Sequence, residues 1–364
     1  MTAVSSAHPL TWVIGRGGLL GQSLETAFDP TGSSDLLWRP PEPIAWSAPR
    51  AGADDLRHQV GEFLREAGDR PWSVAWCAGA GVTDSSGQSL RLELAALGET
   101  LDALAAAPSG SDGAFFFASS AGGVYAGVHA PPYDESSPVR PLGAYGQAKL
   151  DAEALVTAWS HRTGTPSLIG RIANLYGPGQ NLAKAQGLIS QICRSHLTGQ
   201  PVSIYVSLDT LRDYFFAPDC AELIVEGLTR LRQEQSTTQP RGVTGLVITK
   251  ILASQRAITI GAVIGEMRRI FKRSPRVVLG ASPVAALQAK DLSLRSRVWP
   301  DLDRRTLTPF PVGVATTAAD LLRRLQLGAV GMPWSLRDDN RTEARGATSA
   351  AGANAHRAVE DQPR

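Results

Sequence analysis

Apolar residues along the chain alternate between short continuous runs and longer stretches with helical spacing. The runs at 12–14, 72–77 and 114–118 have the length and the apolar content of strands that are buried on both faces. The stretches 55–67 and 90–107 carry apolar side chains at the spacing of amphipathic helices. This alternation predicts the α/β class, with a doubly wound parallel sheet of the Rossmann type.

The rest of the pattern predicts further elements of the same kinds. We expect additional strands at 35–38, 44–46, 243–249 and 277–279, and the strand at 243–249 should return to the sheet. We expect additional helices at 150–159, 187–197 and 258–271. The segment 233–241 is polar and is expected to be a loop.

Three glycines follow the first apolar run in the pattern G-x-x-G-x-x-G. Such a pattern turns a strand tightly into the N-terminus of a helix. The free N–H groups and the dipole of that helix end suit a pyrophosphate. We therefore expect a dinucleotide cofactor to be bound by Gly15, Gly18, Leu19, Leu20 and Gly21.

Two arginines bear on which dinucleotide is bound. Arg39 lies 18 residues after Gly21, close to the spacing of about 20 at which a side chain meets the adenosine ribose. Arg16 lies inside the glycine turn and could reach the same group. An arginine here accommodates a 2′-phosphate, so the pair favours NADP over NAD. The alternative is that both arginines are solvated loop residues and that Glu42 is the ribose ligand.

Small residues follow the apolar run 72–77. Ala78 and Gly79 would let a nicotinamide ribose approach the end of this strand closely, so we include both among the cofactor-binding residues. The alternative interpretation is an ordinary loop between a strand and a helix.

A tyrosine and a lysine four positions apart provide the candidate chemistry. Tyr145 and Lys149 would lie on one face of a helix, about one turn apart. An ammonium group beside a phenol favours the phenolate, which can take a proton from a sugar hydroxyl as a hydride moves. Ser120 could hydrogen-bond the same oxygen, and the neighbouring Ser119 is the alternative for this role. Tyr145 and Lys149 would also contact the cofactor, although an incidental surface pair has the same spacing.

Composition and charge narrow the classes of partner. The net charge is only +2, and no basic tract indicates a nucleic-acid or membrane surface. The three cysteines are widely spaced and the six histidines lack metal-ligand spacing, so no metal site is expected. The first ten residues do not have the pattern of a signal peptide, and no apolar run reaches about 18 residues, so we expect a cytoplasmic protein.

The chain resembles the extended short-chain dehydrogenase/reductases, the NAD(P)-dependent epimerase/dehydratase family, over about residues 11–325. The resemblance rests on the glycine turn, on S-S-x-x-x-V-Y ending at Tyr125, and on Y-x-x-x-K at 145–149. It rests also on R-I-A-N-L-Y-G-P-G at 171–179 and on R-D-Y-F-F-A-P-D at 212–219. The order of these motifs is specific for the family and much less so for the reaction.

The resemblance implies that the substrate is a nucleoside-diphosphate sugar. Asn174 and Arg212 match positions that contact the diphosphate, and an amide and a guanidinium both suit phosphate oxygens. The alternatives are that Asn174 caps a loop and that Arg212 pairs with Asp213 or Asp219. Members of the family tend to dimerise through helices like the one that follows Tyr145, so a homodimer is a further expectation.

These motifs suggest how the chain is divided. We expect residues 11–180 to form mainly the dinucleotide-binding Rossmann domain. Residues 181–335 would form mainly a smaller C-terminal, substrate-binding lobe, with segments that return to the sheet. Residues 337–364 are polar and lack periodicity, which predicts a disordered tail.

Several positions depart from the family pattern. Dehydratases of the family carry an Asp-Glu pair after the active-site Thr, and the matching residues here are Ala and Gly, so dehydration is not expected. Ala95 replaces an Asn before Gly98, and Ser47 replaces an acidic residue that often borders adenine. The strictest alignment puts Ala121 at the Ser/Thr position, whereas the S-S-G-G-x-V-Y variant puts Ser120 there.

Two enzymatic functions fit these motifs. We expect a nucleotide-sugar epimerase, which removes a hydride transiently from a sugar carbon and returns it to the opposite face. The alternative is an NADPH-dependent keto-sugar nucleotide reductase, which Arg16 and Arg39 favour. A third alternative is a non-catalytic NADP-binding member of the family, because Ala95 and Ala121 stand where polar residues are usual.

Overall fold

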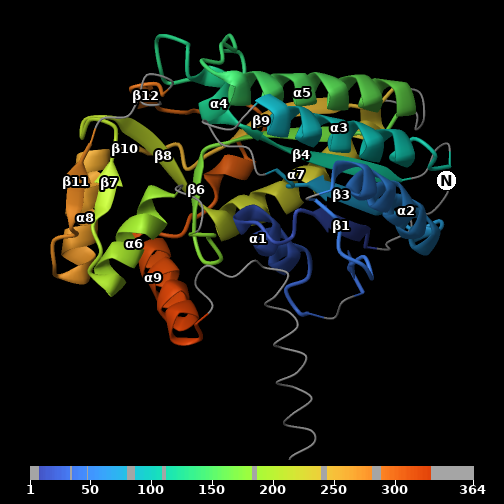
Figure 1. Ribbon diagram of the computed structural model, residues 1–364. Coiled ribbons are helices and arrows are strands. Elements are labelled where there is room, and N and C mark those ends of the chain that lie inside the picture. Colours follow the sequence, from blue (N-terminus) through green and yellow to red (C-terminus); the bar gives the residue numbers. More distant parts are fainter. Residues whose placement is uncertain are drawn as a thin grey trace, which may run out of the picture.

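A six-stranded parallel sheet forms the centre of the computed structural model (Figure 1). The structure describes residues 8–32, 35–46, 48–79, 87–108, 112–182, 187–238, 244–280 and 288–328. The strands follow the order β2-β1-β3-β4-β5-β9, and every neighbouring pair is parallel. Their bounds are β1 Leu10–Ile14, β2 Leu37–Trp38, β3 Trp72–Trp76, β4 Gly113–Ser120, β5 Ser167–Ile172 and β9 Val247–Leu252.

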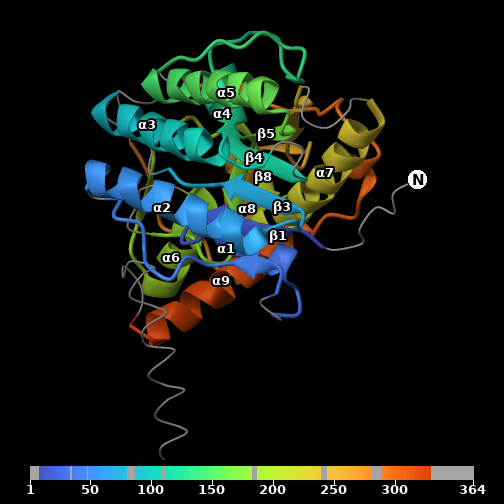
Figure 2. The same ribbon diagram turned by 90° about the vertical axis from the view of Figure 1, so that its right-hand side faces the viewer.

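Helices cover both faces of this sheet (Figures 1 and 2). One face carries α2 (Pro49–Ala67), α3 (Gly87–Leu104) and α5 (Ala144–Thr163), which lie side by side. The other carries α1 (Leu19–Phe28) and α7 (Ala217–Thr238), which pack against each other. The predicted doubly wound Rossmann sheet is therefore confirmed.

The strand β4 illustrates why these strands read as continuous apolar runs. Successive side chains of a strand point to opposite faces of the sheet. Phe115 and Phe117 accordingly join the buried cluster under α2, α3 and α5, whereas Phe116 joins the cluster under α1 and α7. Because both faces are covered, every position between Gly113 and Phe117 is buried.

Smaller sheets and helices form a second group of elements beside the central sheet (Figure 1). A four-stranded sheet consists of β6 (Asn174–Tyr176), β8 (Leu211–Phe216), β10 (Ala257–Thr259) and β12 (Asp291–Leu292). A two-stranded sheet pairs β7 (Val202–Ile204) with β11 (Val277–Leu279). The helices here are α6 (Leu188–Thr198), α8 (Ile260–Phe271) and α9 (Phe310–Gln326), which share one buried apolar cluster.

Two short helical pieces complete the list of elements. The one-turn helix α4 (Ala121–Tyr125) follows β4 directly, and a 3-10 turn covers Leu302–Arg304.

Elements beyond residue 180 also contribute to the central sheet, because β9 is one of its strands and α7 covers one of its faces. The proposed division of the chain near that residue stays a prediction. The expected tail at 337–364 and the position Ser47 lie outside the described residues.

Two of the expected elements are wrong. Residues 44–46 form a turn, in which the backbone N–H of Trp46 donates to the carbonyl of Ile44 at 2.9 Å, and β2 is already the edge strand of the sheet. The polar segment that begins at Gln233 continues α7 to Thr238. Helix α7 continues there because the buried amide of Gln235 satisfies two backbone groups, the carbonyl of Thr244 and the N–H of Leu246.

Candidate functional site

The glycine turn is as tight as the sequence pattern requires. Gly15 has a φ of +94°, and a Cβ atom there would overlap the backbone nitrogen of Ala78. A Cβ atom on Gly21 would overlap the carbonyl oxygen of Gly15. The turn therefore lies against the end of β3, and neither glycine can be replaced without moving the backbone.

The turn leads into the N-terminus of α1. Gly18 precedes the helix, and its N–H donates to the carbonyl of Gly15 at 3.0 Å. Leu20 is buried and Leu19 is half-buried, so they anchor the first turn. Because the capping residue Gly18 has no side chain, it cannot accept a hydrogen bond from the first N–H groups of α1. The first N–H groups of a helix then suit an anion such as a pyrophosphate.

Arg16 and Arg39 are brought together by one carboxylate. The Nε atoms of Arg16 and Arg39 lie 3.0 and 3.4 Å from the same oxygen of Glu25, on α1. The side chain of Glu25 is mostly buried, and the two arginines are about one-third exposed. Two guanidinium groups thus lie beside the glycine turn, whereas Glu42 is exposed and its carbonyl accepts from Gln59.

The end of β3 adjoins a small cavity, which we call the side cavity. Ala78 forms part of its wall together with Glu93 on α3, and Tyr145 and Lys149 on α5 also line it. Gly79 has a φ of +154°, and a Cβ atom there would lie 3.1 Å from Glu93 Oε2. The carboxylate of Glu93 thus lies against Gly79, and contact of Ala78 and Gly79 with a cofactor stays a prediction.

Tyr145 separates the side cavity from a larger one, the main cavity, because it lines both. Lys149 follows one helical turn later, and its Nζ atom donates to the carbonyl of Ala118 at 3.3 Å. The same Nζ atom lies 5.8 Å from the centre of the Tyr145 ring and 5.3 Å from that of Phe117. The ammonium group is thus held beside the phenol without a direct hydrogen bond to it.

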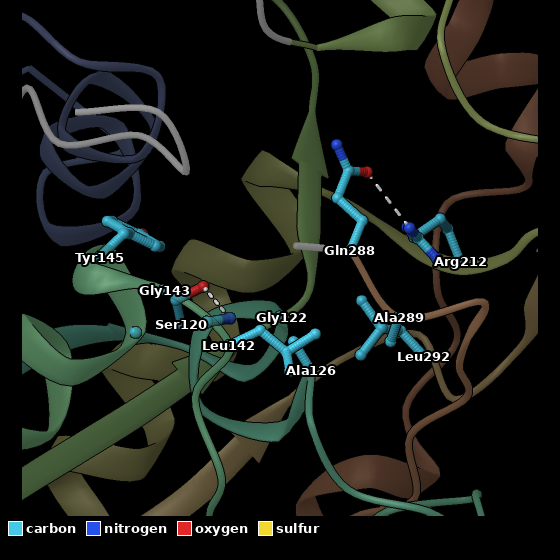
Figure 3. Close-up of a pocket in the computed structure, with 12 residues that line it drawn as sticks. Ser120, Gly122, Ala126, Leu142, Gly143, Tyr145, Arg212, Gln288, Ala289 and Leu292 are labelled. Carbon is cyan, nitrogen blue, oxygen red and sulfur yellow. Dashed lines mark hydrogen bonds between the residues drawn. The ribbon is translucent and has the colours of Figure 1, made fainter. Parts of the chain in front are cut away.

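Ser120 and Ser119 face different surroundings. Ser120 lines the main cavity with Tyr145, and its Oγ accepts from the N–H of Gly123 at 3.1 Å (Figure 3). Ser119 is buried, and its Oγ donates to Glu153 at 2.6 Å. Ala121 is fully buried as well. Of these three neighbours, Ser120 is the one that lines the main cavity.

Arg212, on β8, lies at the opposite end of the main cavity (Figure 3). Its guanidinium donates to the carbonyl of Leu211 at 2.8 Å and to Gln288 Oε1 at 3.3 Å. Among the described residues no carboxylate forms a salt bridge with it, although its exposed fraction is only 7%. Burial lowers the pKa of Arg212 from its usual value, and the charges of Tyr214 and Asp291 oppose this effect only in part. An anionic ligand in the cavity would supply a direct ionic partner.

The two aspartates considered as partners of Arg212 bind elsewhere. Asp213 accepts from the backbone and side chain of Ser254 and from the N–H of Arg256. Asp219 accepts from the backbone and side chain of Thr308. Pairing of Arg212 with either carboxylate is therefore not the arrangement in this structure.

Asn174 is not brought to the wall of the main cavity. It is exposed at the start of β6, and its amide donates to the carbonyl of Asp213 at 3.2 Å. This bond joins β6 to β8, the strand that carries Arg212. Contact of Asn174 with a substrate stays a prediction.

Sequence reasoning missed several residues of the main cavity. Leu142 precedes α5, Gln288 and Ala289 precede β12, Leu292 belongs to β12, and Ala126 follows α4. These residues lie in short segments without a motif. Their juxtaposition is a product of chain topology, so no local signal could have identified them.

Comparisons with known proteins bear on the family and the fold. Residues 54–239, just over half of the chain, match the model of the NAD dependent epimerase/dehydratase family. The chain is similar to dTDP-L-rhamnose 4-epimerase of Burkholderia thailandensis, with 36% identity over 27% of each chain. It is also similar to dTDP-4-dehydro-6-deoxyglucose reductase of Escherichia coli, with 31% identity over 29% of this chain and 33% of that one. The chain spans about a quarter to a third of the length of these curated relatives.

Solved structures support the fold. UDP-glucose 4-epimerase of Thermus thermophilus in complex with NAD has a TM-score of 0.67 and 18% identity, over 86% of this chain and 98% of that chain. The RMD protein of Pseudomonas aeruginosa complexed with NADPH has a TM-score of 0.65 and 20% identity, over 86% and 99%. In the described part of the chain, no helix is long and apolar enough to cross a membrane.

Proposed function

Because the chain belongs to the NAD dependent epimerase/dehydratase family, we propose that it is a nucleotide-sugar epimerase. The observation that carries this proposal is the main cavity, which has Tyr145 and Ser120 at one end and the unpaired, buried guanidinium of Arg212 at the other. A sugar joined to a diphosphate has the same two parts, a hydroxyl group to be oxidised and an anion to be bound.

The glycine turn fits the cofactor that this family uses. Gly15 and Gly21 leave no room for a side chain beside the start of α1, so a dinucleotide backbone can approach the free N–H groups of the helix. A bound nicotinamide dinucleotide supplies the acceptor and donor of hydride. The side cavity, which is lined by Tyr145, Lys149 and Ala78, supports contact of Tyr145 and Lys149 with that cofactor as well, because Ala78 lies against Gly15 of the turn.

The protein's own residues handle the proton. Tyr145 takes the proton of the sugar hydroxyl as the carbon is oxidised, and returns it when the carbonyl is reduced again. The ammonium group of Lys149 lies 5.8 Å from the centre of the Tyr145 ring, beside the phenol that exchanges the proton. Ser120 donates its hydroxyl hydrogen to the same sugar oxygen while its Oγ accepts from Gly123. Arg212 holds the diphosphate, so the sugar can turn about that anchor between the two transfers.

We propose NADP as the cofactor. Arg16 and Arg39 meet at Glu25 next to the glycine turn, which supports binding of a 2′-phosphate by both guanidinium groups. The same pair of arginines favours the second candidate function, an NADPH-dependent keto-sugar nucleotide reductase. In that case Tyr145 donates a proton to a carbonyl once in each turnover.

One experiment tests the proposal and separates the two candidates. The purified protein is analysed by mass spectrometry for co-purifying nucleotides, and then incubated with UDP-, dTDP- and GDP-sugars while the products are followed by NMR. An epimerase converts a sugar to its epimer without net consumption of cofactor. Stoichiometric oxidation of NADPH with a keto-sugar nucleotide would establish the reductase instead, and no binding of any nucleotide sugar would contradict both.

A further inference from the structure

The main cavity has an apolar floor between its two polar ends (Figure 3). This floor consists of Ala126, Leu142, Ala289 and Leu292. Leu292 belongs to a buried apolar cluster under the cavity, and Ala289 packs against that cluster. The part of the floor formed by Leu292 and Ala289 is therefore the top of a packed core, whereas Leu142 offers exposed apolar surface that a ligand can cover.

The floor is fixed directly next to the anion site. Strands β8 and β12 are paired in parallel, with Arg212 in register with Leu292. The side chain of Leu292 also lies against α4, since a Cβ atom on Gly122 would be 3.6 Å from its Cδ1 atom. A sugar that extends from a diphosphate on Arg212 towards Tyr145 must pass over this floor.

We infer that the sugar is a 6-deoxyhexose whose C6 methyl group lies on this floor; the inference rests on the proposed epimerase or reductase function. The described residues of the cavity wall include no carboxylate, and Arg212 is their single cation. A hexuronate carboxylate on the floor would thus have to compete with the diphosphate for Arg212. The 6-hydroxyl of an ordinary hexose would lose its hydrogen bonds to water, whereas a methyl group loses none.

The polar side chains of the described cavity wall lie at its two ends. Gln288 Oε1 accepts from Arg212, and Ser120 Oγ accepts from Gly123 beside Tyr145. Leu142 and Ala126 provide only aliphatic atoms to the floor. An apolar pocket rejects an added hydroxyl group by at most about 100-fold. We therefore expect a 6-deoxyhexose nucleotide to bind ~10- to 100-fold more tightly than the matching hexose nucleotide.

Binding measurements on the full-length protein with NADP⁺ test this. The Kd values of dTDP, dTDP-glucose and dTDP-6-deoxyglucose are compared by calorimetry, and those of UDP, UDP-glucose and UDP-6-deoxyglucose in the same way. Leu142→Gln adds an amide that can bind a 6-hydroxyl, so it should reduce the preference to a few-fold. Leu322→Gln, on α9, is the matched control, because Leu322 is 44% exposed and Leu142 is 39% exposed. Ala126→Ser is a second, smaller change of the floor.

The outcomes separate this inference from the function on which it rests. A preference for the 6-deoxy sugar that falls in Leu142→Gln or Ala126→Ser, but not in Leu322→Gln, supports the inference. Equal or tighter binding of the hexose nucleotide overturns it and leaves the proposed function intact. A preference that neither floor variant changes also overturns it. If no sugar nucleotide binds more tightly than its free nucleotide, the proposed function itself fails.

Discussion

Glu153 and Arg171 form a buried, two-pronged ion pair that joins α5 to β5. The guanidinium donates to Oε1 at 3.1 Å and to Oε2 at 2.7 Å, and Arg171 also donates to the hydroxyl of Tyr125 at 2.7 Å. Ser119 donates to the same carboxylate. This network lies under the end of β4 that presents Ser120, and Glu153 follows Lys149 by one helical turn. It therefore fixes the helix that carries Tyr145 against the strand that carries Ser120.

The ion pair gives a prediction about stability. Glu153→Gln removes the countercharge of a buried guanidinium, so we expect the free energy of unfolding to fall by about 3–5 kcal/mol. Urea denaturation followed by circular dichroism measures this change. Glu266→Gln breaks an exposed pair with Arg269 and should leave stability almost unchanged. Equal stability of the two variants would show that the buried network contributes nothing specific.

Tyr145→Phe should slow turnover strongly, while the fold and cofactor binding are retained. Because general acid–base catalysis typically contributes 10²–10⁴-fold, we expect kcat to fall by about that factor. The measurement is the rate of epimer formation, or of NADPH oxidation, at saturating substrate. Tyr205→Phe, at an exposed tyrosine outside both cavities, is the control. Unchanged kcat in Tyr145→Phe would show that another group exchanges the proton, whereas NADP binding without any turnover in the unaltered protein would favour a non-catalytic role for the chain.

Arg212→Gln should weaken binding of the nucleotide sugar without weakening binding of the dinucleotide. A hydrogen bond to a charged group contributes about 1.5–3 kcal/mol, so the Kd of the sugar nucleotide should rise roughly 10- to 100-fold. Calorimetry with each ligand separately gives both values. Arg269→Gln removes an exposed arginine on α8 and should change neither Kd. If Arg212→Gln weakened binding of the dinucleotide and left binding of the sugar nucleotide unchanged, Arg212 would belong to the cofactor site and not to the substrate site.

Replacing Arg16 and Arg39 should change the choice of cofactor. The double variant Arg16→Ala/Arg39→Ala loses the groups proposed to hold the 2′-phosphate, so the preference for NADP over NAD should fall by about 10- to 100-fold. Fluorescence titration with NADPH and NADH measures the two affinities. Arg57→Ala, on the exposed face of α2, is the control. A fall in both affinities by the same factor would mean that the arginines do not recognise the 2′ position.

The buried cysteines should be unreactive in the folded protein. Burial raises the pKa of Cys193 to about 12, and it raises the pKa of Cys220 as well. Since the thiolate is the reactive form, both residues stay protonated at pH 8 and should resist alkylation. Peptide mapping after iodoacetamide treatment, with and without urea, identifies the modified residues. Rapid labelling of Cys193 in the native protein would show that α6 opens readily.

The residues that could be predicted from sequence are those whose chemistry is local. The spacing of Gly15 and Gly21 reflects steric demands of one turn, and Tyr145 and Lys149 are neighbours on one helix. Arg212 was found only because its segment resembles a known motif. Ser120 could not be separated from Ser119 in sequence, because the choice depends on Glu153, 34 positions away from Ser119.

The residues that could not be predicted depend on contacts between distant segments. Leu292 lines the main cavity because β12 pairs with β8, and Leu142 lines it because the segment before α5 lies against α4, where the N–H of Arg140 donates to the carbonyl of Val124. The sequence near these residues gives no sign of either contact. The wrong strand at 44–46 has a related cause. Ile44 packs against the core and Trp46 lies against Trp76, so both are apolar for packing reasons that do not involve a strand.

The contact between Gly15 and Ala78 has a consequence for engineering this protein. Since a single added carbon would push two strand ends apart, a library that randomises the glycine turn would consist mostly of misfolded chains. The side chains of Arg16 and Arg39 are about one-third exposed beside this turn, and the mostly buried Glu25 pairs with both, so these three positions are best varied together. Changes of coenzyme are therefore best sought at those three positions, and changes of sugar on the opposite wall, where the two searches can proceed independently.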